Sequence, residues 1–119
     1  MSNFWVKEKS TALYQATLKD HTETVIAGSS LDTMTLTLYD VATGDIINSK
    51  SGLNVLNTNG VTISEAGALA WIMESADNAI ATSTSVVEHH KALFQWTWGG
   101  GKKGKHEIDI FVENLTKVT

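Results

Sequence analysis

Three aromatic residues at alternate positions constrain the fold of this chain more than any other feature. Phe94, Trp96 and Trp98 share one parity, and the residues between them are smaller or polar. Successive side chains of a β-strand point to opposite faces, so this spacing places the three rings on one surface. The pattern predicts a strand over residues 92–98 with an aromatic, core-facing side.

A second alternating run follows after a short linker. Ile108, Ile110 and Val112 share one parity, whereas the other parity is acidic except for Phe111. The linker, residues 99–105, contains four glycines and three lysines. The two runs together predict a β-hairpin whose walls lie in the core and whose charged, glycine-rich tip lies in solvent.

The rest of the chain repeats the strand pattern. Strict alternation of apolar and polar residues predicts strands over 11–18, 31–39 and 68–74, and shorter strands are expected at 25–27, 46–47 and 61–63. Asp40 and Gly44 mark a loop after the second long strand, and Asn59-Gly60 favours a turn with two positive φ angles. Residues 48–54 are expected to form a loop.

Only residues 75–81 have helical character, and Ser75 is the expected cap of one or two turns. We therefore predict an all-β domain of about seven or eight short antiparallel strands with one short helical turn. Strands separated by turns every 8–12 residues are typical of a β-sandwich or small barrel.

The 119 residues are expected to form one domain with two short extensions. Residues 1–10 form an N-terminal arm, residues 11–114 the β-sandwich and residues 115–119 a C-terminal tail. Phe4 and Trp5 are two adjacent aromatics in the otherwise polar arm. Either the arm folds back and inserts one ring into the core, or it docks on a neighbouring subunit.

Several classes of protein are disfavoured by composition. No apolar run is long enough for a membrane span, and the start lacks the apolar segment of a secretory signal. A net charge of −4 argues against nucleic-acid binding. The chain has no cysteine, so it has neither a thiol nucleophile nor a thiolate metal site.

We expect no enzyme, cofactor or metal site. The four histidines are His21, His89, His90 and His106. His89 and His90 are adjacent in a strand and so point to opposite faces, whereas zinc requires three or four convergent ligands. Solvated or locally hydrogen-bonded histidines are the expectation. The glycines and lysines of 99–105 do not form a phosphate loop, because a strand follows them instead of a helix.

Two groups of side chains remain as candidates for contact with a partner. The lysines Lys102, Lys103 and Lys105 can meet an acidic surface or a phosphate backbone. Trp98, at the end of its strand, is expected to be the most exposed tryptophan. Exposed tryptophan rings also suit sugar stacking, with Trp98 and Trp5 as platforms.

The chain is similar to small immunoglobulin-like structural proteins of tailed bacteriophages in three runs, 36–47, 59–62 and 94–98. The last of these runs is followed by the glycine-rich tip. The resemblance implies an immunoglobulin-like β-sandwich with a non-enzymatic role in the virion, as a capsid decoration or cement protein, a head-tail joining protein or a tail component. It also implies synthesis in the bacterial host cytoplasm without a signal peptide, and partners among the capsid, neck or tail proteins in a symmetric assembly. The expected interface residues are Phe4, Trp5, Trp98, Lys102, Lys103 and Lys105. A carbohydrate-binding or adhesive β-sandwich module is the alternative.

Overall fold

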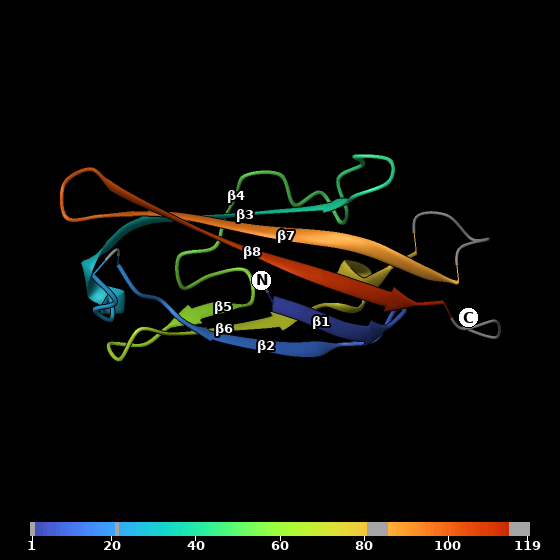
Figure 1. Ribbon diagram of the computed structural model, residues 1–119, viewed down its shortest axis with the longest axis horizontal. Helices are drawn as coiled ribbons and strands as arrows, with labels where there is room; N and C mark the ends of the chain where they lie inside the picture. Colours follow the sequence, from blue (N-terminus) through green and yellow to red (C-terminus); the bar gives the residue numbers. More distant parts are fainter. Residues whose placement is uncertain (1, 21, 81–85, 115–119) are drawn as a thin grey trace.

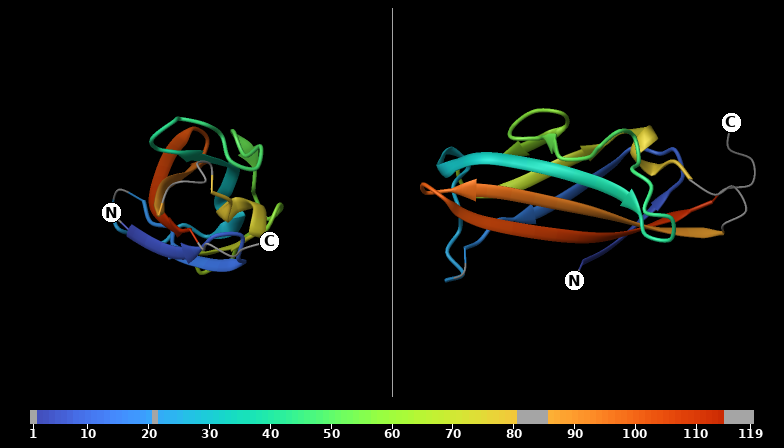
Figure 2. Two further views of the ribbon diagram at one scale, coloured as in Figure 1. Left: turned by 90° about the vertical axis from the view of Figure 1, so that its right-hand side faces the viewer. Right: turned by 90° about the horizontal axis from the view of Figure 1, so that it is seen from above.

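The computed structural model describes residues 2–20, 22–80 and 86–114, which form an elongated β-sandwich of 47 × 23 × 22 Å. Two sheets face each other across the core, with β3, β7 and β8 in one layer and β2, β5 and β6 in the other (Figure 1). Viewed end-on, the strands surround the interior (Figure 2, left). The expected all-β, sandwich-like fold is confirmed.

The described residues contain eight strands and two single-turn 3-10 helices. The strands are β1 (Ser2–Lys7), β2 (Ala12–Thr17), β3 (Leu31–Asp40), β4 (Leu53–Asn54), β5 (Val61–Ile63), β6 (Ala68–Met73), β7 (Val87–Trp98) and β8 (Lys102–Glu113), and the helices are η1 (Gly28–Ser30) and η2 (Ser75–Asn78). The larger sheet has the order β1-β8-β7-β3-β4, and the smaller sheet has the order β2-β6-β5.

The aromatic hairpin forms as predicted but is longer than the sequence pattern. In β7, Phe94 and Trp96 are buried, and in β8, Ile108 and Ile110 are buried while Phe111 points to the outer face. The strands pair without interruption from Val87↔Glu113 to Trp98↔Lys102.

The predicted seven-residue tip is wrong. The loop is only Gly99–Gly101, and all three glycines have positive φ. Lys102, Lys103 and Lys105 belong to β8, because backbone hydrogen bonds pair them with β7 whatever their side chains are.

The main strands of both sheets also follow the sequence pattern. Met34, Leu36 and Leu38 of β3 are fully buried, as are Trp71 and Met73 of β6. These side chains meet between the sheets; the Trp71 ring, for example, packs edge-on against Phe94 at 5.5 Å. The core therefore lies where the alternation placed it.

The expected turns have the predicted backbone conformations. The carboxylate of Asp40 accepts hydrogen bonds from the backbone N–H and hydroxyl of Thr43, and Gly44 has a φ of +76°. Asn59 and Gly60 have φ angles of +52° and +86°.

Three short elements were predicted wrongly. Strands were expected at 25–27 and 46–47, but Val25 and Ile46 each make only a single bridge, to Lys19 and Tyr39 respectively. The second neighbour of β3, besides β7, is instead β4, in a segment predicted to be a loop. A two-residue strand has no detectable alternation, so pairing with β3 determines it.

The helical segment is a single 3-10 turn, η2, and Ser75 does not cap it. Glu74 is the N-cap residue: its main-chain carbonyl accepts from the backbone N–H of Asp77 at 3.0 Å, and the Asp77 carboxylate accepts from the backbone N–H of Glu74 at 2.8 Å. The reciprocal pair satisfies both backbone donors at the start of the turn.

The N-terminal segment forms β1, which pairs with β8 in parallel, so the expectation that all strands are antiparallel is wrong for this pair. Phe4 packs against the core and meets Tyr14 edge-on at 5.6 Å. Of the two alternatives for the arm, folding back onto the domain is the one observed. Trp5, on the opposite parity, remains 58% exposed.

No helix in the described part of the chain has the length and apolar character needed to cross a lipid bilayer.

Candidate functional site

Three rings from three strands form a row on the outer face of the larger sheet. Trp5 of β1 lies opposite Phe111 of β8, which lies opposite His89 of β7. The Trp5 and Phe111 rings stack at 4.9 Å, and the Phe111 and His89 rings stack at 4.8 Å. We call these three residues the aromatic row.

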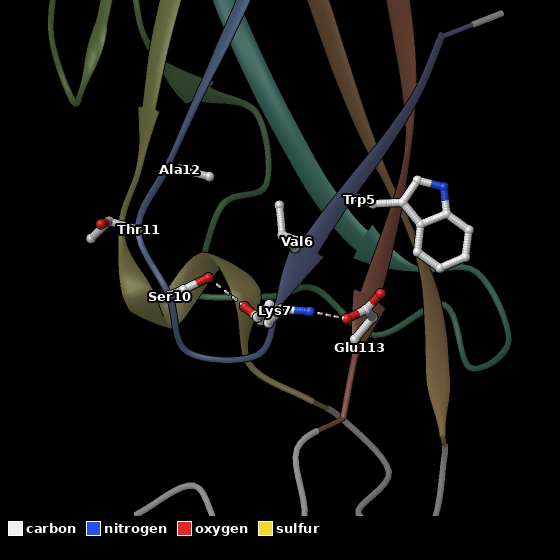
Figure 3. Close-up of a pocket in the computed structure, with 7 residues that line it drawn as sticks. All are labelled: Trp5, Val6, Lys7, Ser10, Thr11, Ala12 and Glu113. Carbon is white, nitrogen blue, oxygen red and sulfur yellow. Dashed lines mark hydrogen bonds and ion pairs between the residues drawn. The ribbon is translucent and has the colours of Figure 1, made fainter.

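Polar contacts hold the aromatic row in place. The Nε2 of His89 lies 2.7 Å from Oδ1 of Asp109, a residue of β8 that is itself nearly buried. Next to Trp5, Lys7 of β1 forms an ion pair with Glu113 of β8 (Figure 3). Because the rings stand on hydrogen-bonded strands, they present a preformed apolar platform with charged neighbours, as many interface centres do.

A shallow pocket of about 280 Å³ lies between β1 and the start of β2. In Figure 3 the Trp5 ring lies beside β8, away from Thr11 and Ala12 on the other side of the pocket. The ionic groups in its lining, Lys7 and Glu113, bond to each other. The pocket therefore offers contact surface but no acid and base arranged around a substrate.

The six residues expected at the interface do not form one site. Trp5 is at the Phe111 end of β8, whereas Trp98 pairs with Lys102 at the other end. Nine residues of strand separate these two positions, or about 30 Å. Lys102, Lys103 and Lys105 are exposed along β8 near Trp98, and Phe4 is half-buried on the core side of β1.

The tryptophan exposures differ from the prediction. Trp98 was expected to be the most exposed, but it is half-buried and packs against the core. Trp5 is the exposed ring, because it lies on the outer parity of an edge strand.

A buried polar cluster lies inside the sandwich, where β3 ends and β7 begins. His90 of β7 is completely buried, and its Nε2 donates to Oε1 of Glu88 at 2.8 Å. Oδ1 of Asp40 lies 3.6 Å from the same nitrogen. Sequence reasoning overlooked this cluster, because Glu88 precedes the part of β7 that the alternation identified.

The ligand atoms of these three residues all lie within 4.8 Å of one another, so the three side chains could together hold a metal ion. They are the group in the described part of the chain with this property. One histidine and two carboxylates are a possible ligand set for zinc or iron. However, a ligating histidine usually donates its second ring nitrogen to a neighbour, and Nδ1 of His90 has no hydrogen-bond partner. The His90–Glu88 hydrogen bond explains the same arrangement without a metal.

The histidines in the described residues are locally hydrogen-bonded, which is one of the two states expected from the sequence. His106 of β8 lies 2.7 Å from the hydroxyl of Tyr14 in β2, which connects the two sheets. Burial lowers the pKa of His106 below its usual 6.5, so the neutral ring is favoured in this contact. His21 lies outside the described residues.

A buried ion pair connects the loop before β4 to η2. The Nζ of Lys50 lies 2.7 Å from the carboxylate of Asp77, and both side chains are almost inaccessible to solvent. Asn48 also donates to Asp77, and the Lys50 ammonium lies 5.8 Å from the centre of the Trp71 ring. Because each group of this network satisfies another, we assign it to stability.

Sequence reasoning also missed two residues of the aromatic row. Phe111 was expected on the charged, outer parity of its strand, and His89 was expected only to point to the face opposite His90. Nothing indicated that the two rings would stack. The signal that could have found them is Phe111, the one apolar residue among the outward acidic positions of β8.

No model of a known protein family and no curated protein sequence matches this chain. The geometry described above is therefore the basis for a functional conclusion.

Proposed function

We propose that the chain is an immunoglobulin-like module that works as a structural component of a tailed bacteriophage virion. The fold part of the proposal is supported by the strand order. Strands two, five and six share one sheet, and strands one, three, four, seven and eight share the other. Immunoglobulin variable-type sandwiches divide their B, D and E strands from C, C′, F and G in the same way.

The functional part of the proposal rests chiefly on one observation, the exposed aromatic row. Stacked rings on a rigid sheet lose little conformational freedom on binding, so they suit contacts between subunits. A non-enzymatic role as capsid decoration or cement, or in head-tail joining, uses such contacts many times over a symmetric lattice. Repetition there multiplies weak contacts into stable attachment.

The first test is whether the protein is part of the particle. Mass spectrometry of purified virions of the phage that encodes the chain should detect it in a fixed copy number relative to the capsid protein. If the protein is absent from virions, the structural role is refuted.

The second test addresses the aromatic row directly. Trp5→Ala should reduce incorporation into particles at least tenfold, because it removes the exposed ring while leaving the core residues in place. Val86→Ala is the matched control, since Val86 is an exposed apolar residue outside the row. Equal incorporation of the two variants would show that the row is not the contact.

A carbohydrate-binding module is the second candidate, because the exposed indole of Trp5 also suits stacking on a sugar ring. A glycan array with the purified protein tests it. Binding that Trp5→Ala abolishes would favour this alternative, and absence of binding to any glycan would remove it.

A further inference from the structure

The strand β8 is longer than the strand that pairs with its free side. β8 runs from Lys102 to Glu113, whereas β1 begins at Ser2, which lies opposite Ile108. Figure 1 shows this offset, with β8 continuing toward the hairpin tip past the start of β1. On the side away from β7, no described residue pairs with β8 over residues 102–107. We call this stretch, about 20 Å long, the bare edge.

The direction of the backbone groups along β8 follows from hydrogen bonds at its other end. Asn114, just past the strand, donates its N–H to the carbonyl of Val86 at 2.9 Å, so the even-numbered residues of β8 bond to β7. The carbonyl of Glu113 accepts from the N–H of Glu8 at 2.9 Å, so the odd-numbered residues turn toward β1.

Beyond the start of β1, this alternation leaves backbone groups of the bare edge unpaired. They are the N–H and C=O of Lys103, the N–H and C=O of Lys105 and the N–H of Glu107, none of which has a partner among the described residues. A row of donors and acceptors of this kind is a template for one more strand.

The bare edge is also basic. Lys102, Lys103 and Lys105 are exposed, and none of them forms an ion pair with another residue that the structure describes. The acid of this stretch, Glu107, lies 3.6 Å from the ammonium of Lys91 on β7. The bare edge is therefore a positive region on a chain whose net charge is −4.

We propose that the bare edge binds an acidic, extended segment of a partner protein, which adds to β8 as a further strand. Main-chain hydrogen bonds hold a segment bound in this way, and its side chains give the specificity. Directly opposite residues of paired strands share a face, so acidic residues at every second position of the segment lie beside Lys103 and Lys105.

The lysines favour this occupant over two others. Pairing with the bare edge of a second copy would set lysines against lysines, and like charges on facing strands are destabilising. A nucleic acid would satisfy the charge, but its phosphate backbone offers acceptors only. It would leave the carbonyls of Lys103 and Lys105 unpaired, whereas a peptide strand supplies both donors and acceptors.

A short peptide of alternating glutamate and valine is the probe, because it is acidic at every second position and favours extended structure. Calorimetric titration at low salt should give a Kd on the order of 0.1 mM. No binding at about 1 mM peptide would overturn the proposal, as would tighter binding of a single-stranded oligonucleotide.

Backbone methylation separates strand addition from charge attraction. Only one set of alternate amides in the peptide can face β8, so methylating the glutamate amides and methylating the valine amides should have unequal effects. One of the two methylated peptides should bind at least tenfold more weakly than the other. Equal binding of both would show attraction by charge alone and would overturn the proposal.

Amide hydrogen exchange locates the bound peptide. In the free protein the amides of Lys103, Lys105 and Glu107 should exchange rapidly, whereas those of Gly104 and His106, which bond to β7, should be protected. About 1 mM peptide should slow the first set about tenfold and leave the second nearly unchanged. Slowing confined to residues outside 102–107 would overturn the proposal.

A charge reversal tests the role of the lysines. Lys105→Glu should weaken peptide binding about tenfold or more, because it replaces attraction by repulsion. Lys9→Glu is the matched control: Lys9 is exposed, the change in net charge is the same, and the residue follows β1 at the opposite end of β8. Circular dichroism confirms that both variants are folded. Equal binding by the two variants would overturn the proposal.

The acidic partner segment is a contact in addition to the aromatic row. Each of these experiments uses the isolated protein, and none of the outcomes depends on Trp5. Failure here and failure of the virion role are therefore distinguishable.

Discussion

Gly104 of β8 lies directly opposite Trp96 of β7, and a single added methyl group there should measurably destabilise the protein. A Cβ atom at Gly104 would lie 2.4 Å from both Cε2 and Nε1 of the Trp96 ring. Unstrained carbon contacts lie at about 3.5–4.0 Å, so the ring would have to move by about 1 Å. Trp96 is only 5% exposed and has little room for that movement.

Two effects of Gly104→Ala oppose each other. Replacing glycine by alanine where the backbone allows it stabilises by about 0.4–1 kcal/mol, because the unfolded chain loses freedom. Overpacking a well-filled core costs about 1–3 kcal/mol. The steric effect should win, so we expect a net loss of about 1–2 kcal/mol. For a domain of this size, each kcal/mol lowers Tm by about 4–6 °C.

Urea unfolding of the wild type and the variant gives the free energy of unfolding directly. A double-mutant cycle with Trp96→Leu shows whether the ring is responsible. The cost of Gly104→Ala should fall below about 0.5 kcal/mol in the Trp96→Leu background. Equal costs in both backgrounds, or a stabilised Gly104→Ala, would refute the reasoning.

Three further variants test other parts of the structure. Lys50→Met should cost about 3–5 kcal/mol in urea unfolding, because it leaves a buried carboxylate without its cation; a loss below about 1 kcal/mol would contradict this. Burial lowers the pKa of His106, so the unfolded chain binds the proton more readily and stability should fall as pH drops below 6.5. His106→Gln should flatten that part of the stability profile, and an NMR titration placing the His106 pKa above 6.5 would refute the account. Lys102→Glu with Lys103→Glu should change stability by no more than about 0.5 kcal/mol, since both side chains are exposed; a larger thermal shift would show an unrecognised contact.

The candidate site was only partly predictable. Trp5 was identified as a contact residue because an aromatic in a polar segment needs an explanation. Its stacking on Phe111 depends on β1 adding to β8 in parallel, a pairing of residues about a hundred positions apart along the chain. Local sequence patterns do not encode such a pairing. The grouping of Trp98 with the arm was an error of the same kind, since no local pattern indicates which surface residues are neighbours.

The buried polar residues show the same limit. Glu88 and His90 share the inward parity of β7 with Phe94, but they precede the strand that the alternation predicted over residues 92–98. They were not expected there because polar residues are normally on the wet side of a sheet. Glu88 and His90 hydrogen-bond to each other, and Asp40, which lies 3.6 Å from the same His90 nitrogen, comes from a different strand.

The sequence by itself determined the class of fold and the core. Strict alternation in β3, β6 and the aromatic hairpin decides which side chains are buried, because a strand turns every second residue to the same face. Turn residues such as Asn59 and Gly60 determined where the chain reverses. Both are local properties, and both can be read from a few consecutive residues.

Only the tertiary structure decided which surfaces can act. The aromatic row combines residues from three strands, and the buried pairs join elements that are distant in sequence. Trp5 and Phe111 illustrate this, since each is an ordinary outward residue until β1 and β8 pair and set them opposite each other. The register between strands is a long-range property, set by the packing of the whole core, and the function proposed for this chain depends on it.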